Sequence, residues 1–155
     1  MALLEMGRIG QGATGYTTAK LTVGQSLVYA RLRAAHGAEA ARLFADSNRE
    51  AIVRMGELVA ELGIECDWEE TSNYVYTKSS GRLGELEDEL EAMREARIAA
   101  ELTRRTELPF PVAGAIRVDH QAQLHPSIPG RPRRTPARGG QSRVRGDVRD
   151  GGSNG

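Results

Sequence analysis

Residues 3–20 read LLEMGRIGQGATGYTTAK, and the interpretation of the whole chain depends on this stretch. Gly10, Gly12 and Gly15 spell G-x-G-x-x-G, the spacing of a dinucleotide-binding fingerprint. In that fingerprint the glycines follow a strand directly, open a helix, and precede an acidic residue by ~20 positions. Here Glu5 comes before the glycines, and the two β-branched threonines after them are a poor helix opening. The spacing taken alone is therefore interpreted as a flexible glycine loop between a strand and a helix.

The reversed order has a second interpretation. The short apolar run Ala2 to Leu4 suits the last residues of a buried strand. If that strand is the second one of a Rossmann unit, Glu5 is the acidic residue at its tip that accepts hydrogen bonds from a ribose. The glycine loop then follows the strand as a later part of the nucleotide-binding unit.

At these residues the chain resembles the FAD-dependent oxidoreductases of the D-amino-acid oxidase and glycine oxidase type, and within them a bacterial subgroup often fused to a Rieske iron-sulfur domain. The resemblance rests on LLEMGRIGQGATGYTTAK, which is fairly specific. It continues in the same order through the supporting motifs YVYT (74–77), LPFPV (108–112) and DHQAQLHP (119–126). It therefore covers residues 1–126.

The resemblance implies a set of FAD-binding residues that share one stretch of chain: Glu5, Arg8, Gly12, Thr14, Gly15, Thr17 and Thr18. By resemblance, Glu5 binds the adenosine ribose hydroxyls, and Arg8 lies beside the adenosine. The glycines and Thr14 are implied at the pyrophosphate, and the last two threonines along the ribityl chain toward the flavin ring. Small residues suit this role because backbone N–H groups approach phosphates only where no bulky side chain intervenes. The alternative for the threonines is simple solvation of a loop.

The implied fold class is a fragment of α+β or α/β type in three parts. Residues 1–22 are expected to form a partial FAD-binding Rossmann-like unit from its second strand onward. Residues 23–126 are expected to be a helical and substrate-domain segment, and residues 127–155 a disordered tail. The implied cofactor is FAD, and the implied substrate is a small amine or amino acid that gives a hydride to the flavin. No catalytic residue is identified.

Periodicity in residues 22–118 predicts alternating helices and strands. Two helices are expected first, one introduced by a capping box at Thr22–Gln25 and stopped by Gly37, and one over 38–62 ended by Gly63. One or two strands over 67–77, with a turn near 72–73, follow, and then a helix with an apolar stripe of Leu83, Leu86, Leu90 and Met93. An extended proline-rich linker over 108–111 and a strand over 115–118 complete the pattern. The acidic run over 85–95 is interpreted as a solvated helix face. Arg97 stands where a glycine stop is usual.

The tail differs in character from the rest of the chain. Residues 127–155 hold seven Arg against two Asp, with recurrent Pro and Gly and no aromatic residue, whereas residues 1–126 hold 14 Lys/Arg against 19 Asp/Glu. This composition predicts disorder, because little apolar surface is available to offset the entropy of ordering. We hypothesise that the tail is a shifted reading frame. With strands of the family expected on both sides, the chain is interpreted as a truncated fragment that is inactive alone.

A function of another class remains open, namely a small helical interaction module whose Arg-rich tail binds nucleic acid through phosphates. The tail lacks the aromatic residues that stack on bases, so no specific nucleic-acid partner is expected. No apolar run approaches the ~20 residues that span a bilayer, so no membrane partner is expected. A cytoplasmic location is expected, and the oligomeric state is not fixed by the sequence.

The remaining candidate residues have structural alternatives. The single Cys66 is interpreted as a small buried side chain before a reactive thiol. Asp119, His120 and His125 lack a suitably spaced partner pair, so no metal site is predicted. The aromatic residues Trp68, Tyr74 and Tyr76 suit either a substrate pocket or packing within a sheet, and packing is favoured.

Overall fold

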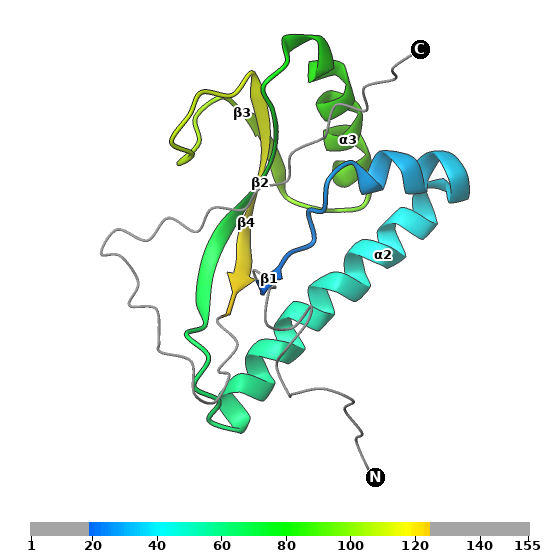
Figure 1. The fold of residues 1–155 in the computed structure, drawn as a ribbon. Helices are drawn as coiled ribbons and strands as arrows, with labels where there is room; N and C mark the ends of the chain where they lie inside the picture. Colours follow the sequence, from blue (N-terminus) through cyan, green and yellow to red (C-terminus); the bar gives the residue numbers. More distant parts are fainter. Residues whose placement is uncertain (1–18, 125–155) are drawn as a thin grey trace, which may run out of the picture.

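The computed structural model describes residues 19–124, which form an antiparallel sheet with helices packed against one face (Figure 1). The elements in chain order are β1 (Lys20–Leu21), α2 (Val28–Glu61), β2 (Glu69–Thr77), the short 3-10 helix η1 (Ser80–Arg82), α3 (Leu83–Glu95), β3 (Ala100–Thr103) and β4 (Gly114–Gln123). The described part is thus a mixed helix and strand structure of α+β type. The strand predicted for residues 2–5 and the tail predicted for residues 127–155 lie outside the described residues.

Strand β4 is the centre of the sheet. Strand β2 pairs along one edge of β4, with Val75 opposite Ile116, and β1 and β3 pair with successive parts of its other edge. All three pairings are antiparallel. Between Asn73 and Thr71 of β2 the partner residue changes from Val118 to Gln121, so β4 carries one extra residue there. This irregularity coincides with the positive φ of 55° at His120 on β4.

Helix α2 consists of two helical parts joined at Gly37, which is visible as a sharp bend near its start (Figure 1). Gly37 has φ 83° and ψ 168°, values that lie outside the helical region. A residue without a Cβ adopts such a conformation at low cost, which is why the helix breaks there. The predicted stops at Gly37 and Gly63 are both confirmed, since α2 ends at Glu61 and Gly63 has φ 57°.

The predicted amphipathic helix is α3. Its stripe residues Leu86, Leu90 and Met93 are buried against the sheet and α2, as the spacing indicates. Arg97 follows the helix with φ 60°, the left-handed conformation that glycine usually supplies. The N–H groups of Arg97 and Ile98 donate to the carbonyls of Arg94 and Met93, both at 2.9 Å, so the end of α3 is closed by its own backbone.

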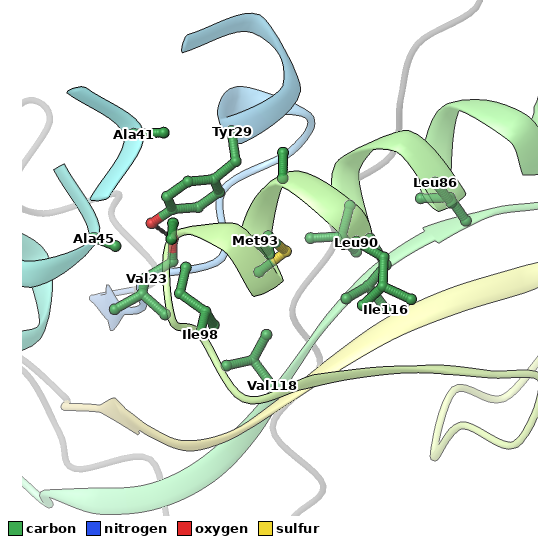
Figure 2. Close-up of a cluster of buried hydrophobic side chains, with 13 residues drawn as sticks. Val23, Tyr29, Ala41, Ala45, Leu86, Leu90, Met93, Ile98, Ile116 and Val118 are labelled. Atoms are coloured by element: carbon green, nitrogen blue, oxygen red, sulfur yellow. Dashed lines mark hydrogen bonds between the residues drawn. The ribbon is translucent and has the colours of Figure 1, made fainter. Parts of the chain in front are cut away.

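The main core lies between the two helices and the sheet (Figure 2). It contains thirteen buried residues, with Tyr29 from α2, Met93 from α3 and Ile116 from β4 all fully covered. The ring of Tyr29 meets that of Phe44 edge to face at 5.8 Å, which joins the two parts of α2. Burial of this cluster is what fixes both helices on one face of the sheet.

Several sequence predictions require correction. Residues 69–77 form one continuous strand, so the predicted turn at Ser72–Asn73 is wrong, because both residues pair with or lie beside β4. Strand β3 was not predicted, and β4 extends well beyond the predicted residues 115–118. The proline-rich stretch over 108–111, predicted as an extended linker, lies in the connection from β3 to β4 and belongs to no helix or strand. Its apolar side chains pack against Tyr76 and Ala115 on the sheet.

Candidate functional site

The seven predicted FAD-binding residues, Glu5, Arg8, Gly12, Thr14, Gly15, Thr17 and Thr18, lie outside the described residues. The description begins at Ala19, the residue directly after Thr18. The structure therefore shows how the chain is held as it leaves the predicted FAD-binding stretch. The segment over residues 19–30 is called the exit segment below.

The exit segment is fixed to the sheet by backbone and side-chain hydrogen bonds. Ala19 accepts from the N–H of Leu124 at 3.1 Å, and β1 continues this pairing along β4. The N–H of Val23 donates to Oε1 of Gln121 at 2.8 Å. Nδ2 of Asn73 donates to the carbonyl of Gly24 at 2.8 Å. Two nearly inaccessible side-chain amides thus anchor consecutive residues of the segment.

The turn at the middle of the exit segment requires a glycine. A Cβ at Gly24 would lie 2.7 Å from Nδ2 of Asn73, the atom that bonds the Gly24 carbonyl. Thr22 forms part of the same turn, because its Oγ1 accepts from the N–H of Gly24 at 3.0 Å. The predicted capping box is therefore wrong. Helix α2 begins six residues after Thr22, at Val28, and the Thr22 hydroxyl serves the turn rather than the helix.

The first turn of α2 is bonded by Glu89, a residue of α3. Its Oε1 accepts from the N–H of Tyr29 at 2.9 Å, and its Oε2 accepts from the N–H of Ala30 at 2.7 Å. Glu89 is 0% exposed, so its interpretation as part of a solvated acidic face is wrong. Burial raises the pKa of Glu89, while the two N–H donors and the charge of Arg31 act in the opposite direction.

The exit segment also contains a cationic side chain, Lys20. Lys20 on β1 is partly buried, and burial lowers the pKa of its ammonium group. Its Nζ lies 3.5 Å from Oδ1 of Asn73, so the same amide contacts Lys20 and Gly24. Asn73, in the middle of β2, thereby contacts the exit segment at two residues, Lys20 and Gly24.

The opposite face of the sheet carries a row of polar side chains. Ser72 donates to Oδ1 of Asp119 at 2.6 Å, and Nε of Arg117 donates to the same oxygen at 2.8 Å. Nη1 of Arg117 lies 3.6 Å from Glu101 on β3. The Ser72 hydroxyl and then the Arg117 charge lower the pKa of Asp119. These groups satisfy one another, and the ion pairs are exposed, so they are worth little as a stabilising element.

The aromatic residues proposed as an alternative substrate pocket are packed. Tyr74 and Tyr76 are buried with Ala115 on the face opposite the helices. The ring of Phe110 lies 5.7 Å from that of Tyr76. The indole of Trp68 lies against Gly56 of α2, where a Cβ would meet it at 3.3 Å. The packing interpretation of these residues therefore agrees with the structure.

The candidate metal and thiol residues carry no site in the described region. Within residues 19–124 no group of three His, Cys, Asp or Glu side chains is placed to hold a metal ion. His120 instead contacts Glu70 across the sheet, and His125 lies outside the described residues. Cys66 is buried, as predicted. Neither helix in the described part of the chain has the length and apolar character needed to cross a bilayer.

The sequence did not indicate the polar residues that hold the exit segment. Glu89 had a usable signal, because it lies three residues after Leu86 and four before Met93 and hence on the apolar stripe of α3. Asn73 and Gln121 had none. Their backbone partners lie 49 and 98 positions away in the sequence, so only the folded sheet brings them together.

Most of the chain is similar to a known protein family. Residues 1–128 match the family model described as FAD-dependent oxidoreductase (DAO). The chain is 30% identical over 126 residues to the putative Rieske 2Fe-2S iron-sulfur protein YhfW of Bacillus subtilis (strain 168), an alignment that covers 81% of this chain and 25% of that protein. The chain thus spans about a quarter of the length of this curated relative. No solved structure gives a significant match.

Proposed function

Because the chain belongs to the DAO family of FAD-dependent oxidoreductases, we propose that it forms part of the cofactor-binding and substrate-binding regions of an enzyme that oxidises amines or amino acids. The observation that supports this is the match over residues 1–128, which includes the predicted FAD-binding stretch and the whole described sheet. In such an enzyme the flavin accepts the hydride, and the protein supplies binding, orientation and electrostatics.

The proposed cofactor-binding residues are those of the stretch before the exit segment. The Glu5 carboxylate accepts hydrogen bonds from ribose hydroxyls, with Arg8 beside the adenosine. Backbone N–H groups at Gly12, Thr14 and Gly15 donate to the pyrophosphate. The chemistry of these groups fits a dinucleotide, since it pairs acceptors with the diol and donors with the phosphates.

The flavin end of the cofactor is assigned to the last residues of that stretch. Thr17 and Thr18 follow the ribityl chain toward the ring, and the chain enters β1 only two residues later, at Lys20. The anchoring of Ala19 and β1 to β4 supports this proposal, because a loop that contacts a cofactor needs a rigid element on which to end.

We further propose that these 155 residues alone bind FAD negligibly, too weakly to retain it through purification, and turn over no substrate, since the aligned part covers a quarter of the relative's length. The proposed partner is a small-molecule substrate. The single cysteine is consistent with the reducing conditions of the cytoplasm, which is the proposed location.

The proposal is tested by nuclear magnetic resonance titration of the full chain with the two halves of the cofactor, because this method detects contacts too weak to survive purification. ADP is expected to shift the amide signals of Glu5, Arg8 and Gly12–Gly15, whereas riboflavin is expected to shift those of Thr17 and Thr18. Absence of any shift within residues 5–18 at millimolar concentrations of both compounds would overturn the proposed site.

The charge of the tail favours one second candidate, a nucleic-acid-binding module. Residues 127–155 hold seven Arg and two Asp, which is sufficient for salt-dependent contact with phosphates. Retention of nucleic acid that falls steeply with added salt, without any response to ADP or riboflavin, would favour this function over the first.

A further inference from the structure

Helix α2 begins without a cap of its own. The residue before its first turn is Leu27, which makes no side-chain hydrogen bond to the helix, and the first turn contains no acidic residue. The first N–H groups of any helix have no partner within that helix. In α2 these donors lie in a buried region, because Tyr29 is fully covered. Leaving them without acceptors would cost stability.

Glu89 supplies the acceptors from another helix. One carboxylate oxygen bonds the N–H of Tyr29 and the other bonds the N–H of Ala30. Both oxygens accept from N–H donors, which only the ionised carboxylate can do fully; because burial raises the pKa of Glu89, this arrangement is complete above the raised pKa. A negative charge at the start of a helix is favoured by the helix dipole, and charge-assisted bonds are stronger than neutral ones. Arg31 is the cation that acts on this carboxylate.

The contact extends from Glu89 to the sheet through Tyr29. The Tyr29 hydroxyl donates to the carbonyl of Val23 at 2.8 Å, a bond drawn in Figure 2, and the N–H of Val23 donates to Gln121 on β4. Burial and the charge of Glu89 raise the pKa of Tyr29, so its hydroxyl stays protonated and able to donate. A continuous series of buried contacts thus joins α3, the exit segment and β4.

We propose that Glu89 is a positioning residue, which fixes the path of residues 19–30 between α3 and the sheet and thereby the end of the stretch that precedes them. Its effect on the cofactor rests on the proposed function, whereas its effect on the exit segment does not.

A neighbouring pair of contacts provides the matched control. Glu91 and Glu95 also join α3 to the start of α2, through Arg33 at 3.3 and 2.9 Å. The Glu91 side chain is 67% exposed and contacts a side chain rather than the helix backbone. If any link between the two helices were sufficient, Glu91 and Glu89 would be equivalent. The proposal holds that only the buried carboxylate matters.

The experiment measures amide hydrogen exchange in the full chain carrying Glu89→Gln or Glu91→Gln. Glutamine preserves the volume but offers one acceptor where the carboxylate offers two, so a backbone N–H loses its partner. In Glu89→Gln, exchange at Tyr29 and Ala30 is expected to accelerate by about tenfold or more. In Glu91→Gln it is expected to stay unchanged.

Amides of the sheet distinguish a local effect from general loss of stability. Exchange at Val75 and Ile116, which reports global unfolding, is expected to accelerate less in Glu89→Gln than exchange at Tyr29 and Ala30. Unchanged exchange at Tyr29 and Ala30, or equal acceleration at all four amides, would overturn the positioning role. If Glu89→Gln does not fold, Tyr29→Phe tests the next contact, the hydrogen bond from the Tyr29 hydroxyl to the Val23 carbonyl. In that variant amide exchange is expected to accelerate at Val23 and to stay unchanged at Ala30. Unchanged exchange at Val23 would contradict the proposal.

The same variants are then titrated with ADP. The response of Gly12–Gly15 is expected to weaken in Glu89→Gln by about threefold and not in Glu91→Gln. If the unaltered chain shows no response to ADP, the proposed cofactor site fails, while the exchange result still decides the role of Glu89 in the exit segment.

Discussion

The two ends of α2 are closed in different ways. At its C-terminal end, the N–H groups of Gly63 and Ile64 donate to carbonyls of the last helical turn, at 3.3 and 3.0 Å. The helix closes itself there, and the only special requirement is the positive φ of Gly63. At its N-terminal end, the donors of Tyr29 and Ala30 are satisfied by Glu89, about 60 positions later in the chain. One end depends on local backbone geometry, and the other exists only when α3 is in place.

The largest predicted effect comes from removing the Glu89 cap at the N-terminal end of α2. Glu89→Ala leaves the buried N–H of Tyr29 and the partly buried N–H of Ala30 without acceptors and is expected to lower the free energy of unfolding by about 2–4 kcal/mol. Urea denaturation followed by circular dichroism measures this change. Glu91→Ala, which removes an exposed carboxylate from the same helix, serves as the control and is expected to change little. Equal effects of the two substitutions would mean that the N-terminal end of α2 does not depend on its buried cap.

A smaller effect on stability is predicted at the C-terminal end of α2, which is closed by its own backbone. Gly63→Ala places a Cβ on a residue with φ 57°, although no atom lies within 4 Å of that position. The strain is therefore conformational, and the free energy of unfolding is expected to fall by about 1–2 kcal/mol. Gly84→Ala is the matched control, because Gly84 lies in α3 with open space around it and no positive φ. A loss of stability in Gly84→Ala as large as that in Gly63→Ala would show that conformation is not the cause.

The end of α3 sharpens the comparison, because it has the same closing bonds as the end of α2 with a different residue. Arg97 occupies the position equivalent to Gly63, with φ 60°. Arg97→Gly removes the strain of a left-handed non-glycine residue and is expected to raise the free energy of unfolding by about 1 kcal/mol, partly offset by glycine's greater freedom in the unfolded chain. Thermal denaturation of the variant measures it, and a lower midpoint temperature would contradict the interpretation.

The difference between these ends explains how much of the fold could be predicted from the sequence. Gly37 and Gly63 act locally, so the breaks of α2 were predicted, and the spacing of Leu86, Leu90 and Met93 predicted α3. The start of α2 was misplaced because its partner is Glu89, whose contact depends on tertiary packing. Strand β3 has only four residues and too little pattern to be recognised without β4 beside it.

The candidate site follows the same rule. The family was recognised, and its FAD-binding stretch was predicted, from motifs contiguous in sequence, and membership in the family is confirmed over residues 1–128. The roles of the seven residues in that stretch stay predictions. The side chains that anchor the exit segment, Asn73, Gln121 and Glu89, come from three distant elements, so no local pattern could assign them.

Glu89 and Glu85, two carboxylates of α3, have pKa values shifted in opposite directions, so their contributions to stability depend on pH in opposite ways. Burial raises the pKa of Glu89 above 4.5, so ionising it costs free energy of folding: the pH-dependent part of its contribution is fully present below the unfolded pKa and is lost as pH rises through the raised pKa, although the two N–H bonds to the carboxylate limit this loss. Hydrogen bonds from Arg82 lower the pKa of Glu85, so its share is present above 4.5 and is lost as pH falls through the lowered pKa.

The most direct test of a buried carboxylate at the start of α2 is the titration of individual glutamate carboxyl groups in the folded chain, followed by carbon-13 nuclear magnetic resonance. The account predicts a midpoint for Glu89 above 4.5 and above that of Glu85, with the amide signals of Tyr29 and Ala30 shifting along the same curve. Amide signals of Tyr29 and Ala30 that do not follow the titration of Glu89 would contradict the account.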